Sequence, residues 1–135
     1  MIKTIGSLLA LFFSPMQTDC LAKNIYFEAR NQPIEGQFAV AEVTMNRVAQ
    51  HGWPSTVCKV VQQKNQFSWY WDGKSDTPRE KLAWSKAQKI ALLYLANPTN
   101  YTSGATYYHA TYVKPDWKNK FIRTTAIGSH EFYRI

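Results

Sequence analysis

The fold of this 135-residue chain is constrained most strongly by two apolar segments with helical periodicity. Only Asn-Gln-Pro, residues 31–33, separates them. In the first segment, apolar residues recur at helical spacing: Leu21, Ala22, Ile25 and Ala29. The second is expected to run from Ile34 to Gln50, with a stripe of Phe38, Ala41, Met45 and Val48 that Val40 and Val43 widen. A helix that is apolar on several sides is typical of the centre of a domain.

A carboxylate interrupts the first apolar segment. Glu28 lies between the bulky Tyr26 and Phe27 on one side and Ala29 on the other, close to the expected helix end. Burying a carboxylate is costly unless it is paired or stays protonated. A carboxyl group held protonated near neutral pH is what a general acid for glycosidic cleavage needs. The alternative is a structural ion pair with a nearby cation: Lys23, Arg30 or Arg47.

The other eight acidic residues stand where local structure accounts for them. Asp19 and Glu80 are expected at helix caps, Glu35 at a helix N-terminus, Glu42 on the outer side of the second helix, Asp72 and Asp76 in turns, and Asp116 and Glu131 in the C-terminal strands. Glu28 is therefore the carboxylate that local sequence leaves unexplained.

Capping and turn signals outline the rest of the fold. The first helix is expected to run from a cap at Thr18 or Asp19 to Arg30, and a short helix is expected after Ser55. Residues 65–74 alternate aromatic and polar side chains and end in Asp-Gly, which is typical of a strand and hairpin. A long helix follows within residues 76–98, where Thr77 and Glu80 match a capping box.

The C-terminal third is rich in β-branched and aromatic residues and is expected to be extended. The sequence therefore predicts an α+β fold, mostly α, with a small β portion in the C-terminal half. The length is that of one ordinary domain. We expect residues 1–17 to be a leader or N-terminal helix and residues 18–135 to form the catalytic domain. The apolar run Ile5–Phe13 is far too short to span a membrane and fits an export signal better.

Charge and composition narrow the classes of partner. The net charge is +7, so the surface suits an anionic partner such as a bacterial wall polymer. The Lys and Arg residues are scattered rather than clustered, which argues against a nucleic-acid binder. The histidines show no HExxH spacing and the cysteines no CxxC, so neither a metal nor a cofactor is expected. Cys20 and Cys58 suit a disulfide in an exported chain or free thiols in the cytosol.

Several segments, in order, resemble the cell wall hydrolase family typified by the spore cortex-lytic enzymes SleB and CwlJ. They read YFEARNQPIEGQFAVAEVTMNRV, WPSTVCKVV, QFSWYWDG, ATYYHATYVKPDW and IGSHEFY, and cover nearly everything from Cys20 onward. The resemblance implies a compact lysozyme-like or lytic transglycosylase-like domain. It also implies cleavage of peptidoglycan between N-acetylmuramic acid and N-acetylglucosamine, with the glutamate of the EAR segment, Glu28, as the catalytic residue.

The chain departs from the family pattern immediately after Glu28. The family usually has Gly-Glu where this chain has Asn31-Gln32, so a second nearby carboxylate is missing. A lytic transglycosylase manages with one carboxyl group, whereas an ordinary glycoside hydrolase needs two. The single glutamate favours the first route. A muramidase-type hydrolase that uses Asp72 or Asp116 and a catalytically idle wall-binding module are the alternatives.

The resemblance also implies supporting residues. Substrate-binding roles are expected for six of them: Gln66, Phe67, Ser68, Trp69, Tyr108 and His109. For the aromatic residues the alternative is core packing, and for His109 it is a hydrogen-bonded strand histidine. Asn46 and Arg47 are expected to be structural and to bind loop carbonyls. A Cys20–Cys58 disulfide is expected if the chain is exported.

The expected setting follows from these roles. A monomer with no stable membrane span would act on peptidoglycan in the cell envelope if residues 1–17 are an export signal. A phage endolysin would instead be held in the host cytoplasm before lysis.

Overall fold

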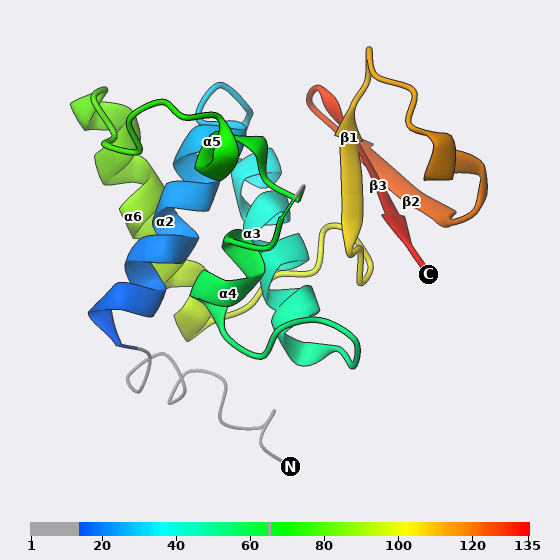
Figure 1. Cartoon of the computed structure of the whole chain (residues 1–135), viewed down its shortest axis with the longest axis horizontal. Helices are drawn as coiled ribbons and strands as arrows, with labels where there is room; N and C mark the ends of the chain where they lie inside the picture. Colours follow the sequence, from blue (N-terminus) through cyan, green and yellow to red (C-terminus); the bar gives the residue numbers. More distant parts are fainter. Residues whose placement is uncertain (1–13, 65) are drawn as a thin grey trace.

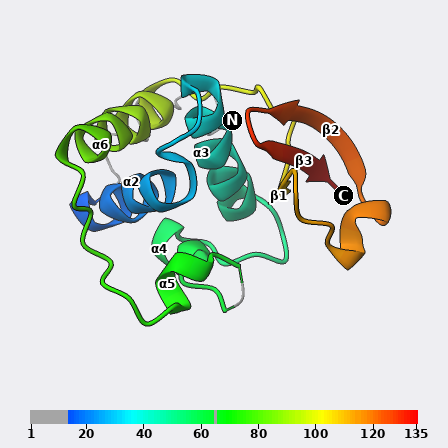
Figure 2. The same ribbon diagram turned by 90° about the horizontal axis from the view of Figure 1, so that it is seen from above.

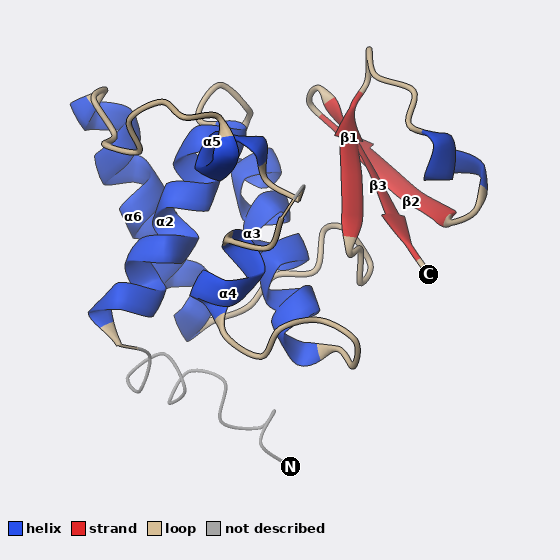
Figure 3. Cartoon of the chain, viewed as in Figure 1, coloured by secondary structure: helices blue, strands red, loops and turns tan. Residues whose placement is uncertain are grey.

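The computed structural model describes residues 14–64 and 66–135. A helical part and a small antiparallel sheet lie side by side (Figures 1 and 3). The predicted α+β class with a C-terminal β portion is thus confirmed. The expected export signal, including the run Ile5–Phe13, lies almost wholly outside the described residues.

The two apolar segments form the helices at the centre of the helical part. Helix α2 spans Pro15–Ala29 and α3 spans Ile34–Ala49. Helix α3 contacts α2, α4 and α6 and also reaches strand β2, which confirms its central position. Figure 2 shows α3 between the other helices and the sheet. The turn between α2 and α3 therefore lies close to the boundary between the two parts of the fold.

Helix α2 begins earlier than the capping signals predicted. The Ser14 side chain accepts a hydrogen bond from the Gln17 amide at 3.2 Å, and Pro15 takes the first helical position. The predicted cap at Asp19 is wrong, because that carboxylate pairs with Lys23 one turn along the helix at 3.1 Å. Residues 15–17, assigned to the leader, belong to this helix.

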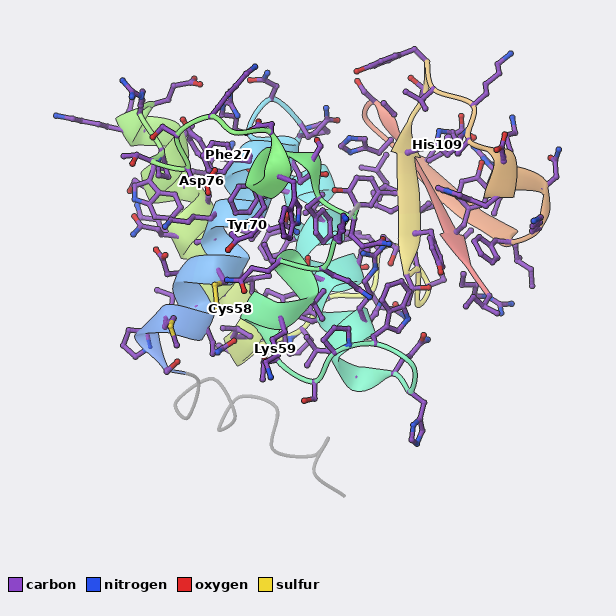
Figure 4. All side chains as sticks on the ribbon, in the orientation of Figure 1. Phe27, Cys58, Lys59, Tyr70, Asp76 and His109 are labelled. Carbon is purple, nitrogen blue, oxygen red and sulfur yellow. A yellow bond between two sulfur atoms is a disulfide. The ribbon has the colours of Figure 1, made fainter. Side chains whose placement is uncertain are left out.

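Helix α4 spans Val57–Val61. Its cap is Thr56, whose hydroxyl accepts from the Lys59 amide at 3.3 Å, and not Ser55 as predicted. A disulfide between Cys20 and Cys58 joins α4 to α2, and Figure 4 shows it beside the Cys58 label. The bond closes a loop across a sequence separation of 38 residues.

Residues 66–74, the described part of the segment 65–74, do not form the predicted strand and hairpin. They contain a single helical turn, α5, at Ser68–Trp71. The Trp69 indole donates to the Asn24 side-chain oxygen at 2.8 Å, and Asn24 in turn donates to Thr44 at 2.9 Å. This buried network fixes the segment against α2. Because the described part of the segment packs on helices and does not pair with the strands of the sheet, its β propensity does not decide its conformation.

Helix α6 spans Lys81–Ala96 and packs along α2 (Figures 1 and 2). The predicted capping box of Thr77 and Glu80 does not form. The amides of Arg79 and Glu80 both donate to the Tyr26 hydroxyl, at 3.2 and 3.0 Å, and the Glu80 carboxylate pairs with Arg30 at 2.6 Å. These contacts with α2 occupy the groups that the capping box would have used.

The predicted outward position of Glu42 is wrong. This residue of α3 is 1% exposed, and its carboxylate accepts four hydrogen bonds from the loop after α6. The donors are the amide and hydroxyl of Thr102, the hydroxyl of Thr99 and the amide of Tyr101. Glu42 thereby fixes the loop that leads into the sheet.

The sheet has three antiparallel strands in the order β1-β3-β2. Strand β1 spans Tyr107–Ala110, β2 spans Ile122–Ile127 and β3 spans His130–Arg134, with a 3₁₀ turn, η2, at Asp116–Asn119. The register places Ala110 opposite His130 and Tyr107 opposite Tyr133. The N-terminal end of β3 therefore lies beside the C-terminal end of β1.

The hairpin between β2 and β3 packs against the turn between α2 and α3. The Ser129 amide donates to the Gln32 side-chain oxygen at 2.9 Å. Gly128 has a φ of 57°, and a Cβ there would lie 2.9 Å from Pro33 Cδ, so this tight contact requires glycine. Among the described helices, none is long and apolar enough to cross a membrane.

Candidate active site

Glu28 lies in the last turn of α2 and faces the sheet. Burial is the largest influence on this carboxyl group and raises its pKa above the ordinary value. A hydrogen bond from Tyr108 and the charge of Arg47 act in the opposite direction and lower it. The net result is a raised pKa, as the apolar sequence around Glu28 predicted.

Tyr108 reaches Glu28 from strand β1. Its phenolic hydroxyl donates to Oε1 of Glu28. Burial, together with the neighbouring Glu28, raises the pKa of Tyr108 well above 10, so the phenol remains a donor throughout the physiological pH range. Tyr108 therefore stabilises the carboxylate form of Glu28 and orients its side chain.

Arg47 on α3 supplies a buried positive charge near Glu28. Its guanidinium lies 4.3 Å from the ring centre of Trp53, 5.2 Å from that of Phe67 and 5.4 Å from that of Tyr107. Its Nε donates to the carbonyl of Thr106 at 2.7 Å. Burial lowers its pKa to about 10, which leaves the group charged at neutral pH.

Asn46, the neighbour of Arg47, also bonds the loop before β1, donating to the Ala105 carbonyl at 2.8 Å. These two bonds are of the kind that the sequence analysis expected for Asn46 and Arg47. They hold β1, and with it Tyr108, at a fixed distance from α3. Of the three cations considered as partners of Glu28, Lys23 pairs instead with Asp19 and Arg30 with Glu80. Arg47, the third, does act on Glu28 through its charge.

Three surface hollows meet at Glu28. The turn-side hollow, between the α2–α3 turn and the sheet, has a volume of about 460 Å³. The α5-side hollow has a volume of about 430 Å³ and is lined by Glu28, Gln66, Ser68, Trp71 and Asp72. The sheet-side hollow, of about 460 Å³, is lined by Arg47, Tyr107, Tyr108 and Trp117 among others. An extended ligand has room on more than one side of the carboxyl group.

The predicted substrate-binding residues divide into two groups. Gln66 and Ser68 are exposed and line the hollows at Glu28, and Phe67 and Tyr108 line the sheet-side hollow. Trp69 is buried, stacks on Phe27 with ring centres 4.7 Å apart, and is absent from the lining of all three hollows. The position of Trp69 favours the packing role that was its alternative.

His109 lines the sheet-side hollow, but both of its ring nitrogens have protein partners. Nδ1 lies 2.7 Å from the Ala110 carbonyl and Nε2 lies 2.9 Å from the Tyr133 hydroxyl. Figure 4 shows His109 on β1 within the sheet. This arrangement favours the alternative of a hydrogen-bonded strand histidine.

The two candidate second carboxylates differ in position. Asp72 lines the α5-side hollow together with Glu28. Asp116 opens η2 and is not among the residues that line the three hollows. Of the two, only Asp72 shares a hollow with the candidate acid.

The structure also adds residues that the sequence analysis did not single out. Gln32, Tyr112 and His130 line the turn-side hollow, and Trp117 lines the sheet-side hollow. The signal was present for all four, since Gln32 shares its segment with Glu28. Tyr112 and Trp117 lie in the segment ATYYHATYVKPDW, and His130 lies in IGSHEFY. Sequence alone did not show that these segments approach Glu28.

The fold and the arrangement around Glu28 define an α-rich domain with a half-buried, protonatable carboxyl group in a polar and aromatic cleft. Comparison with known proteins gives the family. The sequence profile of the cell wall hydrolase family matches residues 31–133, and the chain belongs to that family. The match begins three residues after Glu28, so the assignment of the family does not itself include this residue.

Individual relatives agree with this assignment. The chain is 33% identical over 102 residues to the spore cortex-lytic enzyme of Oceanobacillus iheyensis, a match covering 68% of this chain and 36% of the relative. It is 33% identical over 101 residues to that of Bacillus subtilis, covering 67% of this chain and 32% of the relative. The chain thus spans about a third of the length of these relatives.

Solved structures match the fold over most of its length. The catalytic domain of the germination-specific lytic transglycosylase SleB from Bacillus anthracis matches with a TM-score of 0.76 and 31% identity. That match covers 90% of this chain and 97% of the SleB domain. The catalytic domain of Bacillus cereus SleB gives the same TM-score and identity, with 92% of that chain covered.

Proposed function

We propose that this chain is a peptidoglycan lytic transglycosylase in which Glu28 acts as both acid and base. The observation that carries the proposal is the position of Glu28: a carboxyl group with a raised pKa stands where three hollows meet. The fold shared with the SleB catalytic domain supports the same reaction class.

In the first step, protonated Glu28 donates its proton to the oxygen of the glycosidic bond. The bond between that oxygen and the anomeric carbon of N-acetylmuramic acid breaks, and positive charge develops on the sugar ring. Glu28 is now a carboxylate, which the Tyr108 hydroxyl and the charge of Arg47 stabilise.

In the second step, the Glu28 carboxylate removes the proton from the C6 hydroxyl of the same sugar. The C6 oxygen attacks the anomeric carbon and closes a 1,6-anhydro ring. Glu28 regains its proton, so one residue completes the cycle without a second carboxylate. The first step requires the protonated form of Glu28 and the second requires its carboxylate. Burial favours the protonated form, whereas Tyr108 and Arg47 favour the carboxylate.

A muramidase-type hydrolase is the second candidate because Asp72 lines a hollow together with Glu28. As a carboxylate on the other side of the sugar, Asp72 would act as base or nucleophile. However, Asp72 is exposed and accepts a hydrogen bond from the Lys74 amide at 2.8 Å, as a turn aspartate does. We therefore rank this reaction below the single-glutamate route.

Mass spectrometry of the fragments released from purified peptidoglycan tests the proposal. We expect fragments with anhydro-muramic ends from the unaltered chain and none above background from Glu28→Gln. Asp72→Asn should still produce anhydro ends at a rate within a few-fold of the unaltered chain. Reducing muramic ends that disappear in Asp72→Asn would instead establish the hydrolase. Equal amounts of fragments from the unaltered chain and from Glu28→Gln would show that another residue performs the reaction.

The cellular setting remains part of the proposal. The Cys20–Cys58 disulfide suits an oxidising compartment, which supports action in the cell envelope with residues 1–17 as the source of export. A phage endolysin held in a reducing host cytoplasm would carry the two thiols free until lysis. Alkylation of free thiols in protein taken directly from its native cells distinguishes the two. We also propose that the chain acts as a monomer, which sedimentation at micromolar concentration tests.

A further inference from the structure

The turn-side hollow next to Glu28 contains a histidine to which the proposed reaction gives no role. His130 opens strand β3 within the segment IGSHEFY and lines this hollow. Its ring lies beside that of Tyr108, with ring centres 4.8 Å apart. His130 is therefore one side chain away from the carboxyl group that performs the chemistry.

The hydrogen-bonding capacity of His130 is not used up within the described residues. The side chain is 8% exposed, yet its Nδ1 has no hydrogen-bond partner. Leaving a buried polar atom unpaired costs free energy, so such atoms in native structures call for an explanation. His109, which lies directly opposite Glu131 in the sheet, shows the contrast, because both of its nitrogens are bonded.

The imidazole of His130 is held in its neutral form. Burial is the main cause that lowers its pKa, and the nearby His109 adds to the effect. A neutral imidazole offers one donor and one acceptor nitrogen. It therefore suits hydroxyl and amide groups of a ligand, which also both donate and accept.

The rest of the turn-side hollow has the same neutral, polar character. Asn31 and Gln32 line it with uncharged amide side chains. The nearby cation, Arg30, is already paired with Glu80 at 2.6 Å. Tyr112 stands at the rim with 85% of its surface exposed and presents a ring to solvent. A polar floor with an aromatic rim matches the amphipathic faces of a sugar.

We propose that the turn-side hollow is a sugar-binding subsite that holds one N-acetylated hexosamine adjacent to the bond that is cut. In this subsite His130 hydrogen-bonds the amide or hydroxyl groups of that sugar, and Tyr112 stacks on its ring. This inference rests on the proposed function for the identity of the glycan, and it adds His130 as a binding residue for the substrate.

Binding to an inactive protein tests the subsite without any turnover. The full chain carrying Glu28→Gln is titrated by calorimetry with a tetrasaccharide of alternating N-acetylglucosamine and N-acetylmuramic acid. Adding His130→Phe, which keeps a ring against Tyr108 but removes both nitrogens, should weaken binding about tenfold, as expected for one or two lost hydrogen bonds. His51→Phe is the comparison variant, because His51 is exposed and lines none of the three hollows, and its affinity should change less than threefold.

Tyr112→Ala provides a test that does not depend on a buried position. Its side chain is almost fully exposed, so the variant should fold normally and lose about fivefold to tenfold in affinity through lost stacking. Tyr101→Ala is the matched control, because Tyr101 is also exposed and lines none of the three hollows. Its affinity should be unchanged.

Nitrogen NMR of the histidine rings provides a direct reading without altering His130. On saturation with the tetrasaccharide, the ring nitrogen signals of His130 should shift while those of exposed His51 stay in place. The subsite is refuted if the His130 signals do not move, if the tetrasaccharide does not bind, or if His130→Phe and Tyr112→Ala bind as tightly as their parent. The remaining outcome is that the binding results agree with the subsite while the unaltered chain releases no wall fragments. That combination would support the subsite and refute the proposed reaction.

Discussion

The Tyr108 hydroxyl donates a hydrogen bond to Oε1 of Glu28, although 80 residues separate the two in the chain. Glu28 belongs to a helix and Tyr108 to a strand, so the contact spans the boundary between the helical part and the sheet. The relative placement of these two parts therefore controls the protonation of the candidate catalytic group.

Tyr108→Phe should shift the pH dependence of cleavage. The hydrogen bond stabilises the carboxylate form, so its loss raises the pKa of Glu28 further above the ordinary value. The alkaline limb of the rate profile should move to higher pH. The maximal rate should fall about tenfold or more, since a hydrogen bond to a charged group contributes roughly 1.5–3 kcal/mol.

The comparison variant is Tyr133→Phe, which loses a hydroxyl bonded to His109 rather than to Glu28. It should retain the parent pH profile and show a lower melting temperature. If Tyr108→Phe also retains the parent profile, Tyr108 does not influence the protonation of Glu28 in the working enzyme.

Glu28→Gln should stabilise the protein at neutral pH. Burial raises the pKa of Glu28 in the folded state, so its contribution to stability is fully present below the unfolded value near 4.5 and is lost as pH rises through the folded pKa. Above the folded pKa the folded protein holds a poorly solvated carboxylate, which glutamine removes. Melting temperatures measured from pH 4 to pH 8 should show Glu28→Gln gaining relative to the parent as pH rises.

Glu35→Gln provides the matched control, because Glu35 is an exposed glutamate in the first turn of α3. Its melting temperature relative to the parent should change little between pH 5 and pH 8. A stability difference for Glu28→Gln that is independent of pH, or a loss at neutral pH, would contradict the raised pKa.

Local sequence was sufficient to predict the two long helices on either side of the α2–α3 turn and the raised pKa of Glu28. The spacing of Leu21, Ile25 and Ala29 predicted a buried helix face, and all three are buried. The apolar neighbours of Glu28 predicted its raised pKa. Both predictions concern a single helix and the face that it packs against the core. The periodicity of apolar residues in the sequence identifies that face.

Two of the failures share a cause in long-range contacts. Residues 65–74 have the pattern of a strand, but a buried bond from Trp69 to Asn24 fixes Ser68–Trp71 as a helical turn on α2. The capping box at Thr77 fails because the amides of Arg79 and Glu80 bond to Tyr26. Partners more than 40 positions away decide these conformations, and a single sequence does not record them.

Glu42→Gln should destabilise the fold strongly. The Glu42 carboxylate accepts four hydrogen bonds, whereas a glutamine amide offers one oxygen and turns two donors toward groups that are themselves donors. The free energy of unfolding should fall by about 2–4 kcal/mol, as for other broken buried networks. Urea denaturation measures this, with Glu35→Gln expected to remain within about 0.5 kcal/mol of the parent. A loss below about 1 kcal/mol for Glu42→Gln would show that the loop after α6 is held by other contacts.

Two substitutions of Arg47 separate its structural role from its electrostatic one. Arg47→Lys keeps a positive charge near Glu28 but loses the bond to the Thr106 carbonyl and the planar stacking on Trp53. Its free energy of unfolding should fall by about 1.5–3 kcal/mol, with the pH profile of cleavage close to that of the parent. Arg47→Met loses the charge as well, so the pKa of Glu28 should rise and the alkaline limb should move to higher pH, as in Tyr108→Phe. Identical pH profiles for the lysine and methionine variants would mean that the charge of Arg47 does not act on Glu28, and would leave Arg47 only its role in holding β1 against α3.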